Sequence, residues 1–120
     1  MRTFLILLIL ASTATAATDA LDEVNKVRAR RGLPAFKRDK ALSVAAGKAA
    51  DYRAARRMEG HTSNDFQFVP KGSRARAAGC AAWGLRDGWG ACCTFERWRF
   101  AGAAWAKGRD NRRYMHLFVR

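Results

Sequence analysis

The fold is decided by the stretch Asn25-x-x-Arg28-x-x-x-Gly32-Leu33-Pro34, followed by Asp39-x-x-Leu42-x-x-Ala45-Ala46-x-x-Ala49 and closed by Gly60-His61. Gly32 suits the left-handed conformation that ends a helix, and Pro34 prevents the helix from continuing. Gly60 is a second helix stop. The stretch therefore predicts two helices joined by a tight turn, with His61 in the loop immediately after the second helix.

The first helix is expected from about Asp19 to Arg31, capped by Thr18 or Asp19. Its apolar stripe is formed by residues at helical spacing, namely Leu21, Val24 and Val27. The second helix is expected to begin after a cap at Asp39. Its buried face would carry small and apolar residues, namely Leu42, Ala45, Ala46, Ala49 and Tyr52, with the basic residues, Arg53 included, mostly outside it.

The rest of the chain predicts less regular structure until its end. Residues 62–90 are punctuated by glycine, serine and proline, and we expect a short strand around Phe66 and Phe68 and a helical turn over residues 74–78. The last 25 residues predict a hairpin, with one strand from Trp98 to Trp105 and a second from Tyr114 to Val119. The final strand is expected to be buried against the helices.

The N-terminus has the pattern of an export signal. Arg2 precedes the apolar run Phe4–Leu10, and small residues end at Ala16, which predicts cleavage before Ala17. The apolar run is too short to span a bilayer core of about 30 Å as a helix, which argues against an uncleaved membrane anchor. We therefore expect a signal peptide at residues 1–16, one domain at residues 17–120 without a transmembrane span, and a secreted or periplasmic location.

The chain is strongly basic, with 23 Lys and Arg against 10 Asp and Glu and a net charge of +13. Such a surface attracts polyanions, so the expected partners are anionic envelope polymers, acidic glycans or lipid head groups. No specific role with nucleic acid is expected. The alternative is background composition and solubility, because the basic residues are scattered along the chain.

Three cysteines and a group of tryptophans follow in the exported part. Export favours disulfides, and we expect Cys80 to pair with Cys92 or with Cys93. Core packing is one interpretation of the tryptophans, and a ligand platform is the other. The platform would place tryptophans beside arginines that hold phosphate or carboxylate groups. Its residues are Trp83, Trp89, Arg74, Arg76 and Arg86.

The motifs together resemble the CAP superfamily of cysteine-rich secretory proteins, antigen 5 and pathogenesis-related proteins, as a small bacterial-type member. The resemblance rests on the two-helix stretch, on Gly60-His61-Thr62, on the weaker echo Gly79-Cys80-Ala81-Ala82-Trp83-Gly84, and on the final hairpin. It implies an α+β fold, a three-layer α–β–α sandwich with a small antiparallel sheet. It also implies a cleft in which many members bind a divalent metal with two histidines and two glutamates.

The residues of that cleft carry over only in part. His61 matches the first histidine, whereas Gly79 or Cys80 stands where the first glutamate is expected. The segment 90–99 contains no histidine, although it contains Glu96, and His116 lies at a position that the family does not use as a ligand. One histidine and one glutamate fall short of the three or four ligands of a stable zinc site. We therefore expect no resident cofactor on the family plan.

These observations favour a non-catalytic binding module over an enzyme. The first alternative is a cell-wall or peptide hydrolase, with catalytic candidates His61, Glu96 and His116. A weak divalent metal site would join His61 and His116 with Glu59 or Glu96. A cysteine nucleophile would pair Cys92 or Cys93 with one of the histidines. Lipid or sterol carriage, an activity of some family members, is a further alternative.

Overall fold

The computed structural model describes residues 19–83, 89 and 92–120. The expected signal peptide and Arg86 lie outside these residues. Along the chain the elements are α1 (Ala20–Arg30), β1 (Lys37–Arg38), α2 (Lys40–Arg56), β2 (Ala77–Trp83), the 3₁₀ helix η1 (Cys92–Phe95), β3 (Phe100–Lys107) and β4 (Arg113–Val119).

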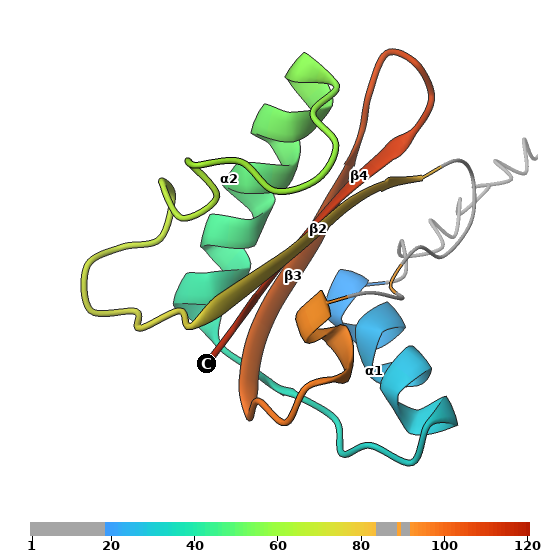
Figure 1. Cartoon of the computed structure of the whole chain (residues 1–120), viewed down its shortest axis with the longest axis vertical. Coiled ribbons are helices and arrows are strands. Elements are labelled where there is room, and N and C mark those ends of the chain that lie inside the picture. The colour runs from blue at the N-terminus through green and yellow to red at the C-terminus, as the bar shows by residue number, and fades with distance from the viewer. Residues whose placement is uncertain (1–18, 84–88, 90–91) are drawn as a thin grey trace, which may run out of the picture.

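The four strands form one sheet in the order β1-β3-β4-β2. β4 pairs antiparallel with β3 on one side and β2 on the other, whereas the two-residue β1 pairs parallel with β3. α2 covers one face of the sheet, and α1 and η1 cover the other (Figure 1). The expected α–β–α sandwich is confirmed, with a mixed sheet because β1 adds a parallel strand at the edge.

Both helices begin after the predicted caps and α1 ends at the predicted stop, whereas α2 ends at Arg56, with Arg57 in the left-handed conformation, before the predicted stop at Gly60. The Asp19 carboxylate accepts a hydrogen bond from the Leu21 amide at 2.8 Å, and the Asp39 carboxylate accepts one from Leu42 at 3.0 Å. These bonds satisfy amides that have no partner within the helix. Gly32 follows α1 with φ of +70°, the left-handed conformation expected of a helix stop.

The apolar core lies in two layers, one on each face of the sheet. Alternate residues of β4 point to opposite faces. Met115, Leu117 and Val119 pack with α1, while Phe118 packs with α2. Every residue from Tyr114 to Val119 is buried, which confirms that the final strand lies inside the molecule.

α2 approaches β3 very closely at a glycine. A Cβ atom added to Gly102 would lie 2.1 Å from the backbone carbon of Leu42 and 2.1 Å from the Ser43 nitrogen. Real Cβ atoms do not reach such distances, so only glycine fits there. The small side chains of Ala45, Ala46 and Ala49 also lie in the core on this side, so α2 packs directly against the sheet.

Several local predictions were wrong. Residues 63–68 form turns in place of a strand around Phe66, and β2 begins at Ala77 within the expected helical turn. Arg53 is buried at 3 % exposure, and Tyr52 is only half-buried. β2 was missed because its residues are mostly alanine, glycine and cysteine, which carry little strand preference.

Among the described residues, no helix combines the length and the apolar character needed to cross a membrane.

Candidate functional site

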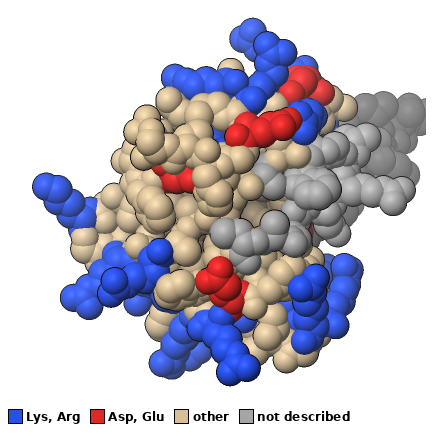
Figure 2. All heavy atoms as spheres, in the orientation of Figure 1, with Lys and Arg blue, Asp and Glu red and all other residues tan. Residues whose placement is uncertain are grey.

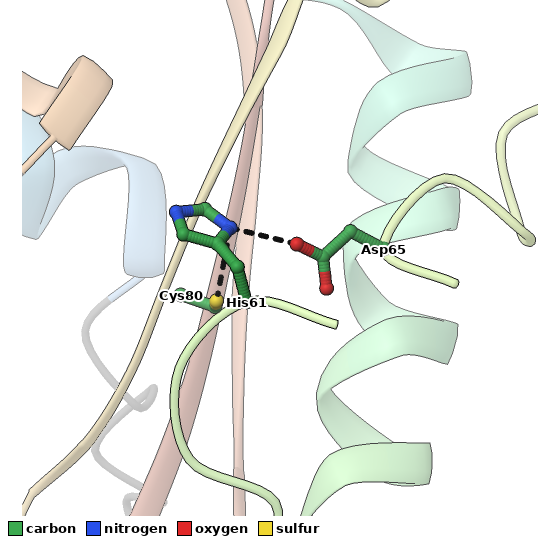
Figure 3. Close-up of side chains that lie close together, drawn as sticks. All are labelled: His61, Asp65 and Cys80. Carbon is green, nitrogen blue, oxygen red and sulfur yellow. Dashed lines mark hydrogen bonds and ion pairs between the residues drawn. The ribbon is translucent and has the colours of Figure 1, made fainter. Parts of the chain in front are cut away.

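Backbone turns after α2 carry His61 to the sheet. Arg57 and Gly60 have φ of +51° and +68°, so the chain turns sharply at two points within four residues of the helix end. His61 then lies beside β2, and Asp65 follows one turn later (Figure 3). The expected position of His61, in the loop after the second helix, is confirmed.

Two side chains meet at one nitrogen of His61. Its Nδ1 lies 2.7 Å from Oδ2 of Asp65 and 3.5 Å from Sγ of Cys80 on β2 (Figure 3). The His61 side chain is 55 % exposed, whereas Asp65 is 6 % exposed. His61, Asp65 and Cys80 are called here the histidine cluster. Its imidazole is accessible to solvent, whereas its carboxylate is buried.

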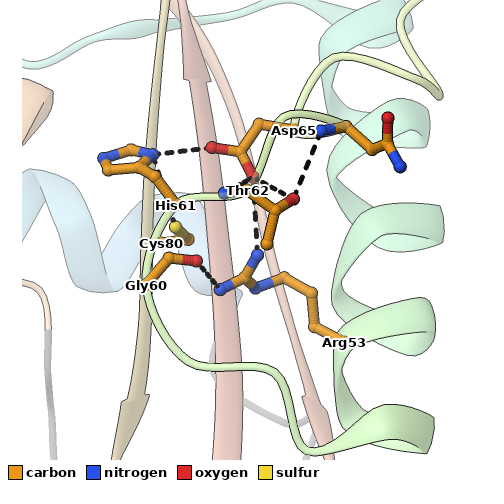
Figure 4. A network of polar contacts seen from close by, with 7 residues as sticks. Arg53, Gly60, His61, Thr62, Asp65 and Cys80 are labelled. Atoms are coloured by element: carbon orange, nitrogen blue, oxygen red, sulfur yellow. Dashed lines mark hydrogen bonds and ion pairs between the residues drawn. The ribbon is translucent and has the colours of Figure 1, made fainter.

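Asp65 is fixed by a network of polar contacts beside the imidazole, on the side toward α2 (Figure 4). Its Oδ1 accepts hydrogen bonds from the amide and hydroxyl of Thr62 at 3.0 and 3.2 Å. The buried Arg53 guanidinium lies 3.5 Å from the same oxygen, and it also donates to the Gly60 carbonyl. Burial would raise the pKa of Asp65, but the hydrogen bonds from His61 and Thr62 outweigh burial and lower that pKa.

His116 lies deeper on the same face. It sits on β4 opposite Cys80 and is 1 % exposed, and among the described residues neither ring nitrogen has a hydrogen-bond partner. Burial, with the charge of Arg53 adding to it, lowers the pKa of His116 to about 4, so the ring is neutral at pH 7. The adjoining cavity measures about 10 Å³, which is room for about one water molecule.

This geometry does not form a Cys-His-Asp triad. In a triad, the carboxylate holds one imidazole nitrogen and the nucleophile gives its proton to the other. Here Asp65 and Cys80 approach the same Nδ1. A proton that Nδ1 donates to Asp65 occupies the position that would accept the proton of Cys80.

The side chains of the histidine cluster could bind a metal ion, although they differ from the two histidines and two glutamates of the family's site. One ligand atom each from His61, Asp65 and Cys80 lies within 4.8 Å of the others. Glu59 pairs with Arg112, and the Glu96 carboxylate accepts a hydrogen bond from Trp98, so both lie outside this group. A nitrogen, an oxygen and a sulfur ligand are a set that suits zinc.

Two of the three cysteines, Cys80 and Cys93, lie on opposite faces of the sheet. Cys80 faces His61 on the α2 side of β2. Cys93 is buried in the α1-side core, where its Sγ lies 3.2 Å from a Cβ built on Gly79. A bond between Cys80 and Cys93 would therefore have to pass through the sheet. Because the side chain of Cys92 lies outside the described residues, the predicted disulfide stays a prediction.

The predicted aromatic platform is likewise dispersed. Trp89 is 6 % exposed, and its indole donates to Glu23 at 2.9 Å, so it packs in the core. Arg74 and Arg76 are exposed in the segment that leads into β2. The side chain of Trp83 lies outside the described residues, as Arg86 does.

Asp65 and Cys80 were not proposed beside His61 from the sequence. The spacing from His61 to Asp65 is four residues, but it falls in a turn-rich segment where no helical period links the two. Cys80 reaches His61 only through the pairing of β2 with β4, and β2 was not predicted. The one signal that could have indicated Asp65 is the presence of two polar residues, Thr62 and Asp65, shortly after a loop histidine.

Comparisons with known proteins agree with this architecture. The profile of the cysteine-rich secretory protein family (CAP) matches residues 21–116. An outer surface protein of Borrelia burgdorferi has a similar fold, with a TM-score of 0.57 and 14 % identity over 83 % of this chain and 88 % of that one. A comparison with curated proteins finds no match. Because the family match spans most of the sequence, the chain belongs to the cysteine-rich secretory protein family.

Proposed function

We propose that this chain is an exported, non-catalytic CAP module that binds anionic components of a cell envelope. The observation that carries the proposal is the charge of the described surface. Exposed acidic residues are few, namely Asp19, Asp22, Asp51, Glu59, Glu96 and Asp110. Exposed basic residues are more numerous and occur on both helices and in most loops, and they include Lys37, Lys48, Arg56, Lys71, Arg97, Arg99, Lys107 and Arg109.

The positive side chains surround the molecule at several places along its rim (Figure 2). Several lie at the lower edge, where the loop after α1 and the segment leading into β3 are found in Figure 1. Such a distribution supports attraction to an extended anionic surface. An envelope location is also in keeping with the Borrelia protein of similar fold, which is an outer surface protein.

A non-catalytic role is further supported by the burial of His116, a catalytic candidate from the sequence. His116 is 1 % exposed, and the adjoining cavity has room for about one water molecule, so a peptide or sugar does not reach it there. His61 and Cys80 also lack the two-nitrogen relay that a cysteine hydrolase uses. A hydrolase built on His61 is therefore the less favoured alternative.

The test is binding to an acidic polysaccharide and to vesicles that contain an anionic phospholipid, each at rising salt. Uncharged dextran and neutral vesicles serve as controls. We expect binding to weaken strongly from low to physiological ionic strength, where screening shortens to about 8 Å. Binding that ignores salt, or no binding to either anionic material, would contradict the proposal.

A second candidate function is metal binding by the histidine cluster. The observation that favours it is the convergence of one nitrogen, one oxygen and one sulfur ligand within 4.8 Å. His61 and Asp65 would each supply one of these atoms, and Cys80 would bind as the thiolate. His116 is outside the group, so this site differs from a pairing of the two histidines.

Calorimetric titration with zinc tests this candidate. We expect a 1:1 heat signal in the reduced protein that His61→Ala and Cys80→Ser both abolish. Lys48→Gln, an exposed change on α2, is the control. The absence of heat at sub-millimolar zinc removes the candidate, and so does a thiol count that finds Cys80 oxidised in the folded protein.

A further inference from the structure

A second concave region lies at the opposite side of the sheet from the histidine cluster. It is a groove of about 590 Å³ between the loop after α1 and the segment that leads into β3. This volume is in the usual range for ligand sites in proteins. The groove is lined by Arg28, Leu33, Pro34, Lys37, Arg97, Trp98 and Arg99, together with Gly32 and Ala35. We call it the Arg28 groove.

The base of the Arg28 groove carries a buried positive charge. Arg28 is 1 % exposed, and its guanidinium donates at 2.8 Å to each of three carbonyls, those of Pro34, Thr94 and Glu96. Carbonyl oxygens satisfy its donors without cancelling its charge. Among the described residues, no carboxylate forms an ion pair with Arg28, and burial lowers its pKa from the ordinary arginine value. A buried cation without a counter-charge favours an anion nearby.

The walls of the groove add to that charge and are held in place. Lys37, Arg97 and Arg99 are exposed at its rim. The Asn25 side chain fixes the loop by accepting a bond from the Phe36 amide at 2.8 Å and donating to the Phe36 carbonyl at 3.2 Å. The groove is thus bounded by backbone that two side chains of α1 fasten, and it needs little ordering when a ligand binds.

Trp98 gives the groove an apolar wall with a fixed orientation. Its side chain is half-buried, and its indole nitrogen donates to the Glu96 carboxylate at 2.9 Å. Glu96 is an acidic residue at this margin, where Arg28 and the three rim cations outweigh it. Leu33 and Pro34 extend the apolar surface beside Trp98.

We propose that the Arg28 groove binds a segment of an acidic glycan, with sugar carboxylates on Arg97 and Arg99 and a sugar ring against Trp98. This inference rests on the proposed function and names its site and its ligand. A planar carboxylate pairs with a guanidinium through two parallel hydrogen bonds. A sugar ring presents an apolar C–H face to the indole and polar edges to the cations.

An acyl chain fits the groove less well. Most of the lining is apolar, as an acyl chain requires, but the rim places cations beside Leu33 and Trp98, and a neutral chain would leave these cations without an anionic partner. The charges also come from several positions of the lining rather than from one, which matches a polymer with a carboxylate on each sugar. An acidic glycan is therefore the proposed ligand of the Arg28 groove.

The experiment measures the affinity of the full mature chain for a hexamer of galacturonic acid at low salt. The test variant is Arg97→Gln with Arg99→Gln. The control is Lys48→Gln with Arg109→Gln, which removes the same charge from exposed positions elsewhere. We expect the groove variant to lose about tenfold in affinity and the control to lose about twofold, because two charge-assisted contacts are removed only in the former. Unchanged thermal unfolding shows that both variants fold.

The outcomes separate the inference from the proposed function. Equal losses in the two variants overturn the groove and leave a diffuse polyanion-binding surface. Binding to anionic vesicles with none to the hexamer overturns the glycan. If the unmodified protein binds neither the hexamer nor anionic vesicles, the proposed function fails, and the inference fails with it. Binding of an uncharged cellulose hexamer with equal affinity contradicts the role of the arginines.

Discussion

Each helix carries one buried arginine, and the two arginines have different partners. Arg53 on α2 is 3 % exposed and faces the buried carboxylate of Asp65. Arg28 on α1 is 1 % exposed and donates to three carbonyls, with no carboxylate paired to it among the described residues. The first lies over a cavity of about 10 Å³, and the second at the base of a groove of about 590 Å³.

The difference separates a buried charge that is paired with a carboxylate from one that is held by carbonyls at the base of a groove. On the α2 side, the buried carboxylate of Asp65 matches the charge of Arg53 within the protein, and the adjoining cavity has room for about one water molecule. On the α1 side, the guanidinium of Arg28 donates to carbonyls, and no carboxylate of the described residues pairs with it at the base of the groove. Burial of an arginine alone therefore does not mark a site, and the site proposed above rests on Arg28 together with the groove and the cations at its rim.

The largest expected effect comes from disrupting the close contact between α2 and β3 at Gly102. Gly102→Ala would place a Cβ 2.1 Å from the backbone of α2, where no side chain can move away. We expect a loss of about 4 kcal/mol or more in the free energy of unfolding, or a failure to fold. Urea denaturation measures it.

Gly47→Ala is the matched control for this change, since Gly47 lies within α2 and a Cβ there meets nothing within 4 Å. We expect a gain of about 0.5–1 kcal/mol from the higher helix preference of alanine. A mild loss for Gly102→Ala, similar in size to that gain, would show that α2 does not sit tightly on β3.

A double-mutant cycle tests whether Arg53 and Asp65 match each other. Arg53→Met alone leaves a buried carboxylate without its cation, and we expect a loss of about 3 kcal/mol. The double change Arg53→Met with Asp65→Asn should lose less than the sum of the single changes by about 1–3 kcal/mol. Additive losses would mean that the two groups are not coupled, and the contrast with Arg28 would lose its basis.

His116 makes the stability of the α2 side depend on pH. An unfolded histidine binds a proton near pH 6.5, whereas folded His116 does so only near pH 4. The unfolded state therefore takes up more protons as pH falls between these values, and stability present above pH 6.5 declines by about 3 kcal/mol at pH 4. Asp65, whose pKa is lowered, adds its own loss only below its ordinary value of 3.8.

His116→Leu should flatten this decline, as followed by urea denaturation at pH 7, 5.5 and 4. The groups that face His116 are Arg53, Asp65 and His61, and all three are kept in the variant. A profile for His116→Leu that still falls by the same amount between pH 6.5 and 4 would assign the effect to other groups.

The smallest expected effect is at His61. Its side chain is 55 % exposed, and its contact with Asp65 faces water on one side. We expect His61→Ala to reduce stability by no more than about 1 kcal/mol, since exposed ion pairs contribute little. A loss of several kcal/mol in thermal or urea unfolding would make His61 a structural part of the α2 side rather than its accessible edge.

Much of the frame could be predicted because it depends on local signals. The caps at Asp19 and Asp39, the stop at Gly32 and the hairpin at the C-terminus are each specified by neighbouring residues. The prediction that His61 lies in the loop after the second helix was confirmed, although α2 ends at Arg56 and not at Gly60. The family resemblance added the layer order, which the structure and the comparisons bear out.

The parts that failed depend on contacts between distant segments. Arg53 has the same local signal as any basic residue near a helix end, and its burial follows from Asp65 in the next loop. β2 lacks strand-forming residues, and it is held as a strand by β4. The Arg28 groove joins residues about 65 positions apart, so no window of sequence contains it.

Mapping the glycan contact residue by residue tests the central claim most directly. Amide and indole signals of the isotope-labelled protein are followed by NMR while the galacturonic acid hexamer is added at low salt. The account predicts that shifts gather at residues 32–37 and 97–99, with the indole signal of Trp98 among the largest. Shifts centred on His61 and Asp65, or spread evenly over the basic surface, would contradict it.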